Sequence, residues 1–208
     1  MFVEPNLKAR HNTGWIEVIS GGMFSGKTEE LIRRVTRAKI ARQKVAMFKP
    51  AIDNRYHSLH IVSHDANAIY SSSVETARQI WEQASQESVD VVGIDEGQFF
   101  DPEIVDVCND LANHGIRVIV AGLDMDYQGR PFGPMPFLMA VSEFVTKLHA
   151  VCAVSGELAS YSYRKIASDE QVLLGETEIY EARCRRHFFN PDEQDPASPN
   201  YQDQGRED

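Results

Sequence analysis

Hydrophobic and polar positions along the chain follow two patterns, which predict strands and helices in turn. Short apolar runs have the length of buried strands, and apolar residues at helical spacing lie between them. The predicted strands are Trp15–Ile19, Val45–Lys49, Val89–Ile94 and Ile116–Ala121. The first helix is predicted after residue 28, where Leu31, Ile32, Val35 and Ala38 recur, and further helices are predicted over Val74–Gln86 and Asp101–His114. This alternation predicts a parallel α/β sheet flanked by helices.

The segment between the first strand and the first helix carries the clearest chemistry. It fits G-x-x-x-x-G-K-[ST], the phosphate-binding P-loop pattern. Glycines let successive N–H groups point at phosphate oxygens, and the helix N-terminus favours negative charge there. Lys27 can reach the β- and γ-phosphates, and the Thr28 hydroxyl can ligate Mg²⁺, so the chain is predicted to bind a nucleoside triphosphate. The predicted phosphate-binding residues of this loop are Gly21, Gly22, Met23, Phe24, Ser25, Gly26, Lys27 and Thr28.

Two later strand ends carry further polar and aromatic residues. Asp95 and Glu96 follow the apolar run Val91–Ile94, as a Walker-B acid does, and we expect that run beside the P-loop strand. One acid could then hold Mg²⁺ and the next face the phosphate acceptor, although a solvated strand end is the alternative. The second strand end opens a Gly/Pro-rich loop, Leu123–Gly133, which contains Asp124, Tyr127, Gln128, Arg130 and Phe132.

The connection Ala51–Ser73 is long for a structureless loop, and such loops tend to be functional. It carries three histidines, His57, His60 and His64. Their spacing matches no closed metal site without cysteine or carboxylate partners, so a solvated loop is the preferred interpretation.

Composition limits the function classes. The chain has 208 residues, a formal net charge of −10 and 42% hydrophobic residues, as expected of a globular protein. The negative charge argues against a nucleic-acid polymer as partner, since phosphate backbones require a basic footprint. No apolar run is long enough to cross a bilayer, so no membrane association is expected. Residues 1–13 lack a signal peptide's apolar core, and three cysteines indicate reduced thiols in a cytoplasm.

In combination, the motifs resemble the type II thymidine kinases, a P-loop family. They are Gly-Gly-Met-Phe-Ser-Gly-Lys-Thr at 21–28, Asp-x-Arg-Tyr at 53–56, Asp-Glu-Gly-Gln-Phe-Phe at 95–100, Arg-Pro-Phe-Gly at 130–133 and Lys-Leu-His-Ala-Val-Cys at 147–152. The resemblance covers Gly14 to Phe189. It implies a RecA-like P-loop kinase domain over 14–148 and a small lasso domain of zinc-ribbon type over 149–189. Residues 1–13 would be an extension, and residues 190–208, rich in Pro, Asp, Gln and Asn, a disordered acidic tail.

The resemblance also implies an activity and its residues. The γ-phosphate of ATP would pass to the 5′-hydroxyl of thymidine, or of deoxyuridine, giving dTMP, with Glu96 as the general base. Thr28 and Asp95 would hold Mg²⁺, and Asp53, Arg55, Gln98 and, by the loosest match, Arg164 would lie near the phosphates. The family is usually a homotetramer inhibited by dTTP. The implied nucleoside pocket comprises Met23, Phe99, Leu123, Tyr127, Phe132 and Tyr180.

The chain departs from the family at its zinc site, which usually has two C-x-x-C pairs. Here the pairs read Cys152-x-x-Ser155 and Cys184-x-x-His187. Serine is a poor Zn²⁺ ligand and histidine an acceptable one. The three remaining candidates, Cys152, Cys184 and His187, would make an open and weaker site, so we expect that the metal has been lost and that packing holds the hairpins instead. Phe100, Phe137, Phe144 and Cys108 are expected in the core.

Two other function classes use related motifs. Asp-Glu-x-Gln also occurs in helicase motor domains, which need a second motor domain and basic tracks that this chain lacks. A nucleotide-binding switch that reads guanine would carry Asn-Lys-x-Asp, and the chain has no such sequence.

Overall fold

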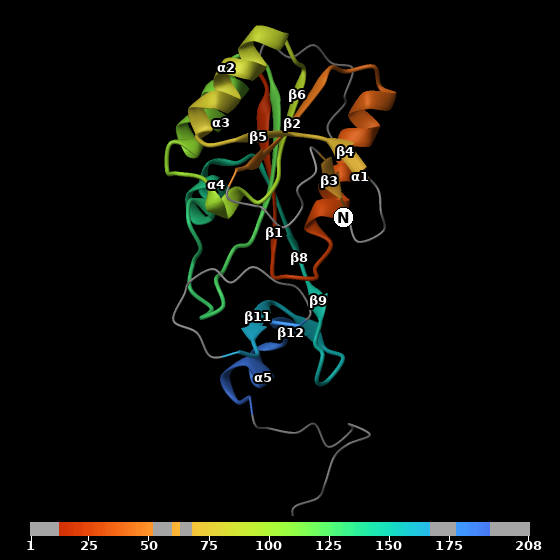
Figure 1. The fold of residues 1–208 in the computed structure, drawn as a ribbon, viewed down its shortest axis with the longest axis vertical. Coiled ribbons are helices and arrows are strands. Elements are labelled where there is room, and N and C mark those ends of the chain that lie inside the picture. Colours follow the sequence, from red (N-terminus) through yellow and green to blue (C-terminus); the bar gives the residue numbers. More distant parts are fainter. Residues whose placement is uncertain (1–12, 52–59, 63–67, 167–177, 192–208) are drawn as a thin grey trace, which may run out of the picture.

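A computed structural model of the chain describes residues 13–51, 60–62, 68–166 and 178–191. Its centre is a six-stranded sheet in the order β5-β2-β6-β7-β1-β8, in which all neighbouring strands are parallel (Figure 1). The strands are β1 (Trp15–Gly21), β2 (Val45–Pro50), β5 (Ser72–Val74), β6 (Val91–Ile94), β7 (Arg117–Gly122) and β8 (Phe144–Leu148).

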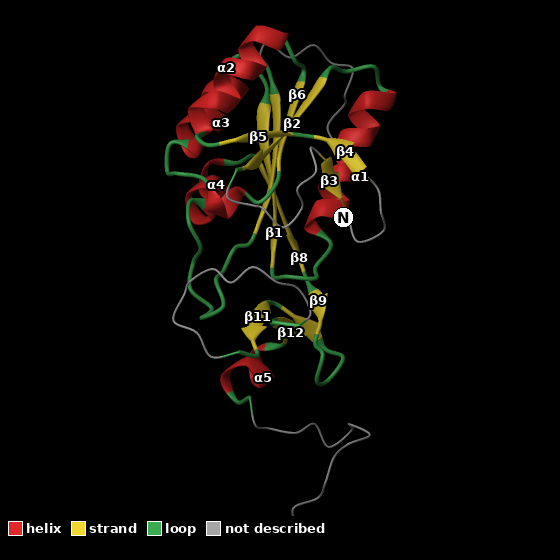
Figure 2. Cartoon of the chain, viewed as in Figure 1, coloured by secondary structure: helices red, strands yellow, loops and turns green. Residues whose placement is uncertain are grey.

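Helices cover both faces of this sheet (Figure 2). Because side chains alternate along a strand, each central strand feeds two apolar layers. In β7, Val118 and Val120 belong to the layer under α2, α3 and α4, whereas Ile119 and Ala121 belong to the layer under α1. The helices are α1 (Lys27–Ile40), α2 (Ala77–Glu87), α3 (Ile104–Asn113) and α4 (Met135–Val141), with a 3₁₀ turn, η1 (Gly97–Phe99), after β6.

A smaller module follows β8 and lies beyond the end of the sheet that carries the P-loop (Figure 1). Two antiparallel pairs and one short helix form it, and Ala150, Ala159 and Ala182 lie in its small apolar core. Its elements are β9 (Ala150–Val151), β10 (Leu158–Ala159), β11 (Tyr161–Arg164), β12 (Tyr180–Arg183) and α5 (Arg185–Phe189), and a further antiparallel pair, β3 (His60–Val62) with β4 (Ala68–Tyr70), lies between β2 and β5 in sequence.

A buried ionic cluster joins α1 to the sheet. The fully buried Glu17 carboxylate on β1 accepts hydrogen bonds from Arg34 Nη1 at 2.8 Å and from Arg117 Nε at 2.6 Å. The Trp15 indole N–H donates to the same carboxylate at 2.7 Å. Arg34 also donates to Glu30, at 2.8 Å, and to Thr146. Residues of α1, β1, β7 and β8 are thereby held together around one carboxylate.

The α/β architecture and the four predicted strands are confirmed. The helix expected over Asp101–His114 begins only at Ile104, and Glu103 is its N-cap residue; Asp101 lies before the helix, where its Oδ1 accepts the Glu103 N–H at 2.9 Å. The expected helix from Val74 instead begins at Ala77.

Three expectations were wrong. The Asp95 strand β6 does not adjoin the P-loop strand, because β7 lies between β6 and β1. The segment 51–73 is not only a connection, since its last residues enter β5 at the sheet edge. Phe137 is 66% exposed on α4, because that helix turns Met135 and Leu138 to the core instead. Phe100 and Cys108 are buried as expected, and Phe144 is half-buried.

Candidate active site

The P-loop connects β1 to α1, and two of its side chains donate to the same carbonyl oxygen. Gly22 O accepts hydrogen bonds from Ser25 Oγ at 2.8 Å and from Lys27 Nζ at 2.7 Å. Gly21 cannot carry a side chain, because a Cβ there would lie 2.4 Å from the Leu148 carbonyl oxygen of neighbouring β8. Gly26, at φ +81°, starts α1 in the left-handed region. The loop therefore has the short, curled backbone that phosphate binding requires.

Asp95 directly follows β6 and lies against the first turn of α1. Its Oδ2 accepts a 3.2 Å hydrogen bond from Thr28 Oγ1, which brings together the two oxygen donors predicted for Mg²⁺. Burial and the adjacent Glu96 carboxylate raise the pKa of Asp95 from 3.8 to about 7. Carboxylate and hydroxyl oxygens suit a hard divalent cation, and such a cation would favour the ionised form of Asp95. The donor set fits the predicted metal.

Glu96 follows Asp95 and has a left-handed backbone conformation, at φ +53°. It is the residue before η1, so the start of this turn fixes the direction of its side chain. Its Oε2 accepts a hydrogen bond from Gln98 Nε2. The other end of the Gln98 amide, Oε1, accepts the Leu123 N–H at 2.9 Å. Gln98, predicted near the phosphates, thus directs both ends of its amide to protein atoms.

Lys27 carries a positive charge that interacts with these acids. Burial lowers the pKa of Lys27, and the charges of Glu96, Asp95 and Asp124 oppose that shift. Asp124, two residues after β7, is buried and also forms a 2.8 Å ion pair with Lys147 of β8. Asp124 was noticed in the loop after β7 but was not assigned to the site; its place next to Lys27 follows from β7 lying between β6 and β1.

The predicted pocket residues fall into two groups. Phe99 on η1 and Phe132 meet edge to face, with ring centroids 5.7 Å apart, beside the Gln98–Leu123 contact. In the second group, the Arg164 guanidinium lies 3.4 Å from the centre of the Tyr127 ring and donates to the Tyr180 hydroxyl at 2.9 Å.

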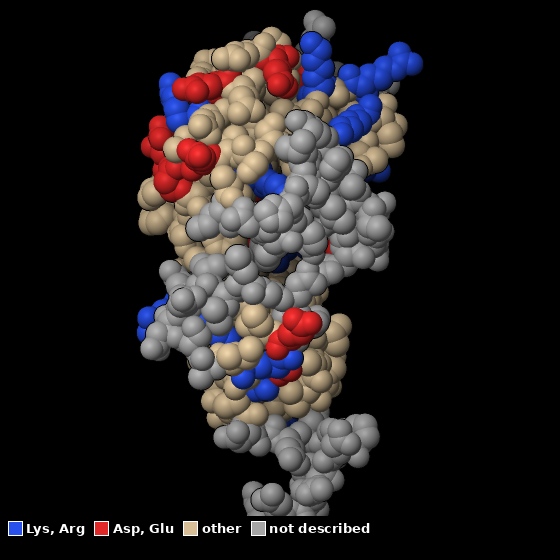
Figure 3. Space-filling model, viewed as in Figure 1, with Lys and Arg blue, Asp and Glu red and all other residues tan. Residues whose placement is uncertain are grey.

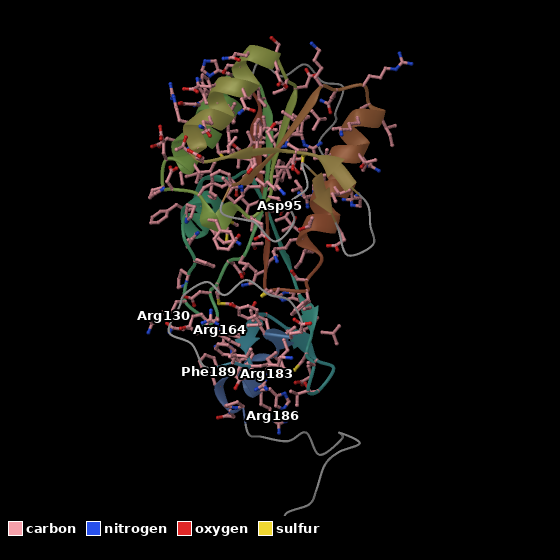
Figure 4. The ribbon with its side chains drawn as sticks, viewed as in Figure 1. Asp95, Arg130, Arg164, Arg183, Arg186 and Phe189 are labelled. Atoms are coloured by element: carbon pink, nitrogen blue, oxygen red, sulfur yellow. The ribbon has the colours of Figure 1, made fainter. Side chains whose placement is uncertain are left out.

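Arg164 was matched only loosely to a position near the phosphates, and here it joins two predicted pocket tyrosines. Figure 4 shows Arg164 in the small module and Asp95 on the sheet above it.

The small module contacts the P-loop directly. Met23 N–H donates to Ser162 Oγ of β11 at 2.9 Å, and Phe24 packs against the apolar core of the module. Phe24 adopts φ +62°, a region that a bulky side chain rarely occupies. Ser162 was not predicted; a serine in a short strand carries no sequence signal for this contact. The phosphate loop and the module are therefore one packed unit.

The Cys/His cluster is formed as the resemblance implied. Donor atoms of Cys152, Cys184 and His187 all lie within 4.8 Å of one another, and all three residues are buried. His187 Nδ1 lies 3.7 Å from Cys152 Sγ and 3.3 Å from Cys184 Sγ, close to the roughly 3.6 Å between sulfur and nitrogen ligands of tetrahedral zinc. Ser155 Oγ lies 3.8 Å from Cys184 Sγ. Three donors therefore fit the metal, and the fourth position holds a serine.

Electrostatics at Cys152 suit a metal-binding thiol. Burial would raise the pKa of Cys152, but the Ser155 side chain and the backbone N–H groups around the sulfur lower it to about 6. By contrast, burial among apolar side chains raises the pKa of Cys108 to about 12, so that thiol is inert.

Some of the predicted features lie outside the described residues. They are the site residues Asp53 and Arg55, the histidines His57 and His64, and most of the predicted acidic tail. No helix in the described part has the length and apolar character needed to span a membrane. Acidic side chains gather over α2 and α3 on the face in Figure 3, and no continuous basic track crosses the described atoms there.

Comparison with known proteins identifies the family. The family model described as thymidine kinase matches residues 14–188. The thymidine kinase of Bacteroides fragilis is 55% identical over 188 residues, which cover 90% of this chain and 94% of that protein. The thymidine kinase of a Rhodothermus species is 58% identical over 193 residues, covering 92% and 89% of the two chains. These matches give no support to a helicase-type motor or a guanine-reading switch.

Proposed function

The chain belongs to the thymidine kinase family, and on that premise we propose that it transfers the γ-phosphate of ATP to the 5′-hydroxyl of thymidine with Glu96 as the general base. The observation that carries the proposal is the convergence of Glu96, Asp95 and Lys27 at the end of the sheet. Coulombic interactions join Lys27 to both acids, and Thr28 joins Asp95 to the P-loop.

Phosphoryl transfer depends on positioning and on neutralising phosphate charge. The P-loop N–H groups and Lys27 would hold the triphosphate, and Lys27 would exchange its contact with Gly22 O for phosphate oxygens. Thr28 and Asp95 would hold Mg²⁺, which supplies positive charge at the β- and γ-phosphates. As the resemblance implies, Asp53, Arg55 and the remaining P-loop residues would also bind the phosphates.

The hydroxyl needs a base as it becomes a nucleophile. Glu96 would accept the 5′-hydroxyl proton while the O5′–phosphorus bond forms and the bond from the γ-phosphorus to the β,γ-bridging oxygen breaks, so that ADP leaves and dTMP remains. Phe99 and Phe132, with Met23, Leu123, Tyr127 and Tyr180, would enclose the flat base. An aromatic slot favours a pyrimidine ring through stacking and exclusion of water.

The test is the Glu96→Gln variant, which keeps the shape of the side chain and removes its basicity. We expect kcat for dTMP formation to fall by about 10²–10⁴-fold with little change in the KM for ATP. The exposed Glu82→Gln change on α2 is the matched control and should leave kcat unchanged. Full activity of Glu96→Gln would refute only the assignment of Glu96 as the base. If the native protein hydrolysed ATP without thymidine and formed no dTMP, the proposed function itself would be refuted.

Further properties rest on the family. We propose that deoxyuridine is a weaker substrate, that dTTP inhibits by occupying the thymidine site, and that the enzyme is a homotetramer. Competition between dTTP and thymidine and light scattering of the purified protein test the last two. The free thiols of Cys108, Cys152 and Cys184 support action in the reducing cytoplasm.

A further inference from the structure

Gln98 links the proposed catalytic base to the wall of the nucleoside pocket. Its amide is nine-tenths buried, with 3% of the residue exposed, and each end meets a protein partner. Nε2 donates to Glu96 Oε2, and Oε1 accepts the Leu123 N–H. A flipped amide would turn an oxygen toward the carboxylate and an NH₂ toward an N–H donor, so these two partners fix the orientation.

The space around Gln98 is closed by glycines from two other segments. A Cβ at Gly122 of β7 would lie 2.9 Å from Gln98 Oε1, and a Cβ at Gly133 would lie 2.2 Å from the Gln98 carbonyl oxygen. Gly133 also has φ +51°, which disfavours a side chain on its own. The ends of β6 and β7 and the loop before α4 therefore meet at this residue.

The short η1 turn gives these contacts a functional consequence. Glu96 precedes it in a left-handed conformation, Gln98 lies within it, and Phe99 at its end meets Phe132. Movement of the base relative to the pocket would have to break the Gln98–Glu96 or the Gln98–Leu123 hydrogen bond. A displacement of about 1 Å between base and hydroxyl is enough to lower a transfer rate by about a hundredfold.

We propose that Gln98 is a positioning residue for phosphoryl transfer: its amide sets the plane of the Glu96 carboxylate and joins it to Leu123 at the pocket wall, in place of a contact with ATP. The inference rests on the proposed role of Glu96 as the base. A neutral amide suits this task, since it donates to the carboxylate without competing for the proton that Glu96 must take up.

Charged groups from three segments influence the Glu96 carboxylate, directly or through Lys27. Lys27 of α1 and Asp95 at the end of β6 interact with the Glu96 charge, and Asp124 after β7 acts on Lys27. An acid at position 98 keeps these three side chains but adds a negative charge near them, which would raise the pKa of Asp95 and so lower kcat as pH falls. A ratio of variant to native kcat that rises as pH falls therefore reports on the contact between positions 96 and 98.

Two variants test the proposal through steady-state kinetics with thymidine, ATP and Mg²⁺ between pH 6 and 8. Gln98→Met removes donor and acceptor at similar length. We expect kcat to fall about tenfold to a hundredfold, the usual effect of losing a hydrogen bond to a charged group, with the KM for ATP within twofold of native. A raised KM for ATP at unchanged kcat would overturn the inference and favour the phosphate contact instead.

Gln98→Glu keeps an acceptor for the Leu123 N–H but can donate to Glu96 only when protonated. Two carboxyl groups in hydrogen-bond contact retain a shared proton to higher pH than one alone. The kcat of Gln98→Glu relative to native enzyme should therefore rise as pH falls from 8 to 6. A merely structural defect would give a constant ratio, and a constant ratio overturns the proposal.

The controls separate this inference from the proposed function. Gln86→Glu makes the same charge change on the exposed side of α2, and its ratio to native kcat should be one at every pH. Should Gln98→Met not fold, as judged by thermal unfolding, the pH series of Gln98→Glu decides. If Glu96→Gln is inactive while both Gln98 variants behave as native, only the role of Gln98 is lost; if Glu96→Gln is fully active, the base assignment is lost as well.

Discussion

The buried carboxylate of Glu17 anchors the helix that begins at the P-loop, and its loss should destabilise the whole chain. Glu17 and Arg34 are completely buried, and Arg117 is 2% exposed. The carboxylate accepts four hydrogen bonds, from Arg34 Nη1, Arg117 Nε, Arg117 Nη2 and Trp15 Nε1. Glu17→Gln keeps the volume but removes the charge and turns an NH₂ group toward donors.

The expected loss follows from what is left behind. Two buried guanidinium groups lose their shared counter-charge, and breaking a buried pair from one side costs about 3–5 kcal/mol. Arg34 retains its contact with Glu30 Oε1 at 2.8 Å, which places the expected loss toward the lower end of that range. With about 2–4 °C per kcal/mol for a chain of this size, Tm should fall by roughly 6–12 °C.

Thermal and urea unfolding of Glu17→Gln and of the exposed control Glu82→Gln provide the measurement. The loss at position 17 should persist in 1 M NaCl, because salt does not screen a buried cluster, whereas the pair Arg33–Glu30, with Arg33 49% exposed, should weaken. The double variant Glu17→Met with Arg34→Met should lose less than the sum of its single changes. A loss under 1 kcal/mol, or strict additivity, would refute the reasoning.

Two further predictions concern charge and metal. Asp95 has a folded pKa of about 7 against 3.8 unfolded, so the folded state binds its proton more tightly and loses that stability as pH rises from about 4 to 7. Asp95→Asn should therefore raise Tm by at least a few degrees at pH 8 and by little at pH 4, while abolishing dTMP formation. The control is Asp106→Asn, at an exposed position of α3. An unchanged Tm of Asp95→Asn at pH 8 would contradict the linkage. By elemental analysis, the native protein should contain well under one zinc per chain. Ser155→Cys completes a set of four zinc donors, so this variant should bind one zinc per chain and have a higher Tm. A full equivalent of zinc in the native protein would show that serine or water suffices as the fourth ligand.

Local patterns were enough to predict several of the residues that the structure brings together beside the P-loop. The P-loop is a contiguous segment whose strand, glycines and helix start all lie within fourteen residues, Trp15–Thr28, and Asp95 and Glu96 follow a recognisable apolar run. These residues are near one another in sequence or at strand ends, where parallel topology gathers them. The hydrogen bond between Thr28 and Asp95, and the charge interactions of both acids with Lys27, follow from that placement.

Contacts between distant segments could not be predicted in the same way. Glu17 lies in an apolar run and looks like one polar position in a strand, but its partners are 17 and 100 residues away. The place of β7 between β6 and β1 is a matter of strand order, which periodicity does not encode. The prediction that Phe137 lies in the core was wrong, because a seven-residue helix has too few positions to decide which side faces the core.

The two non-glycine residues of the site with left-handed backbones, Phe24 and Glu96, show what the distant contacts contribute. Such a conformation costs of order 1–3 kcal/mol and persists only where surrounding contacts outweigh it. For Phe24 those contacts come from the core of the small module, reinforced by the Met23–Ser162 hydrogen bond; for Glu96 they come from Gln98 and, through it, Leu123. Each of these two residues is thus supported by a segment that also contributes to the proposed nucleoside pocket. The P-loop and the proposed base are therefore held by the same elements that would enclose the acceptor. Loss of packing in the small module should weaken phosphate binding even when the P-loop sequence is unchanged.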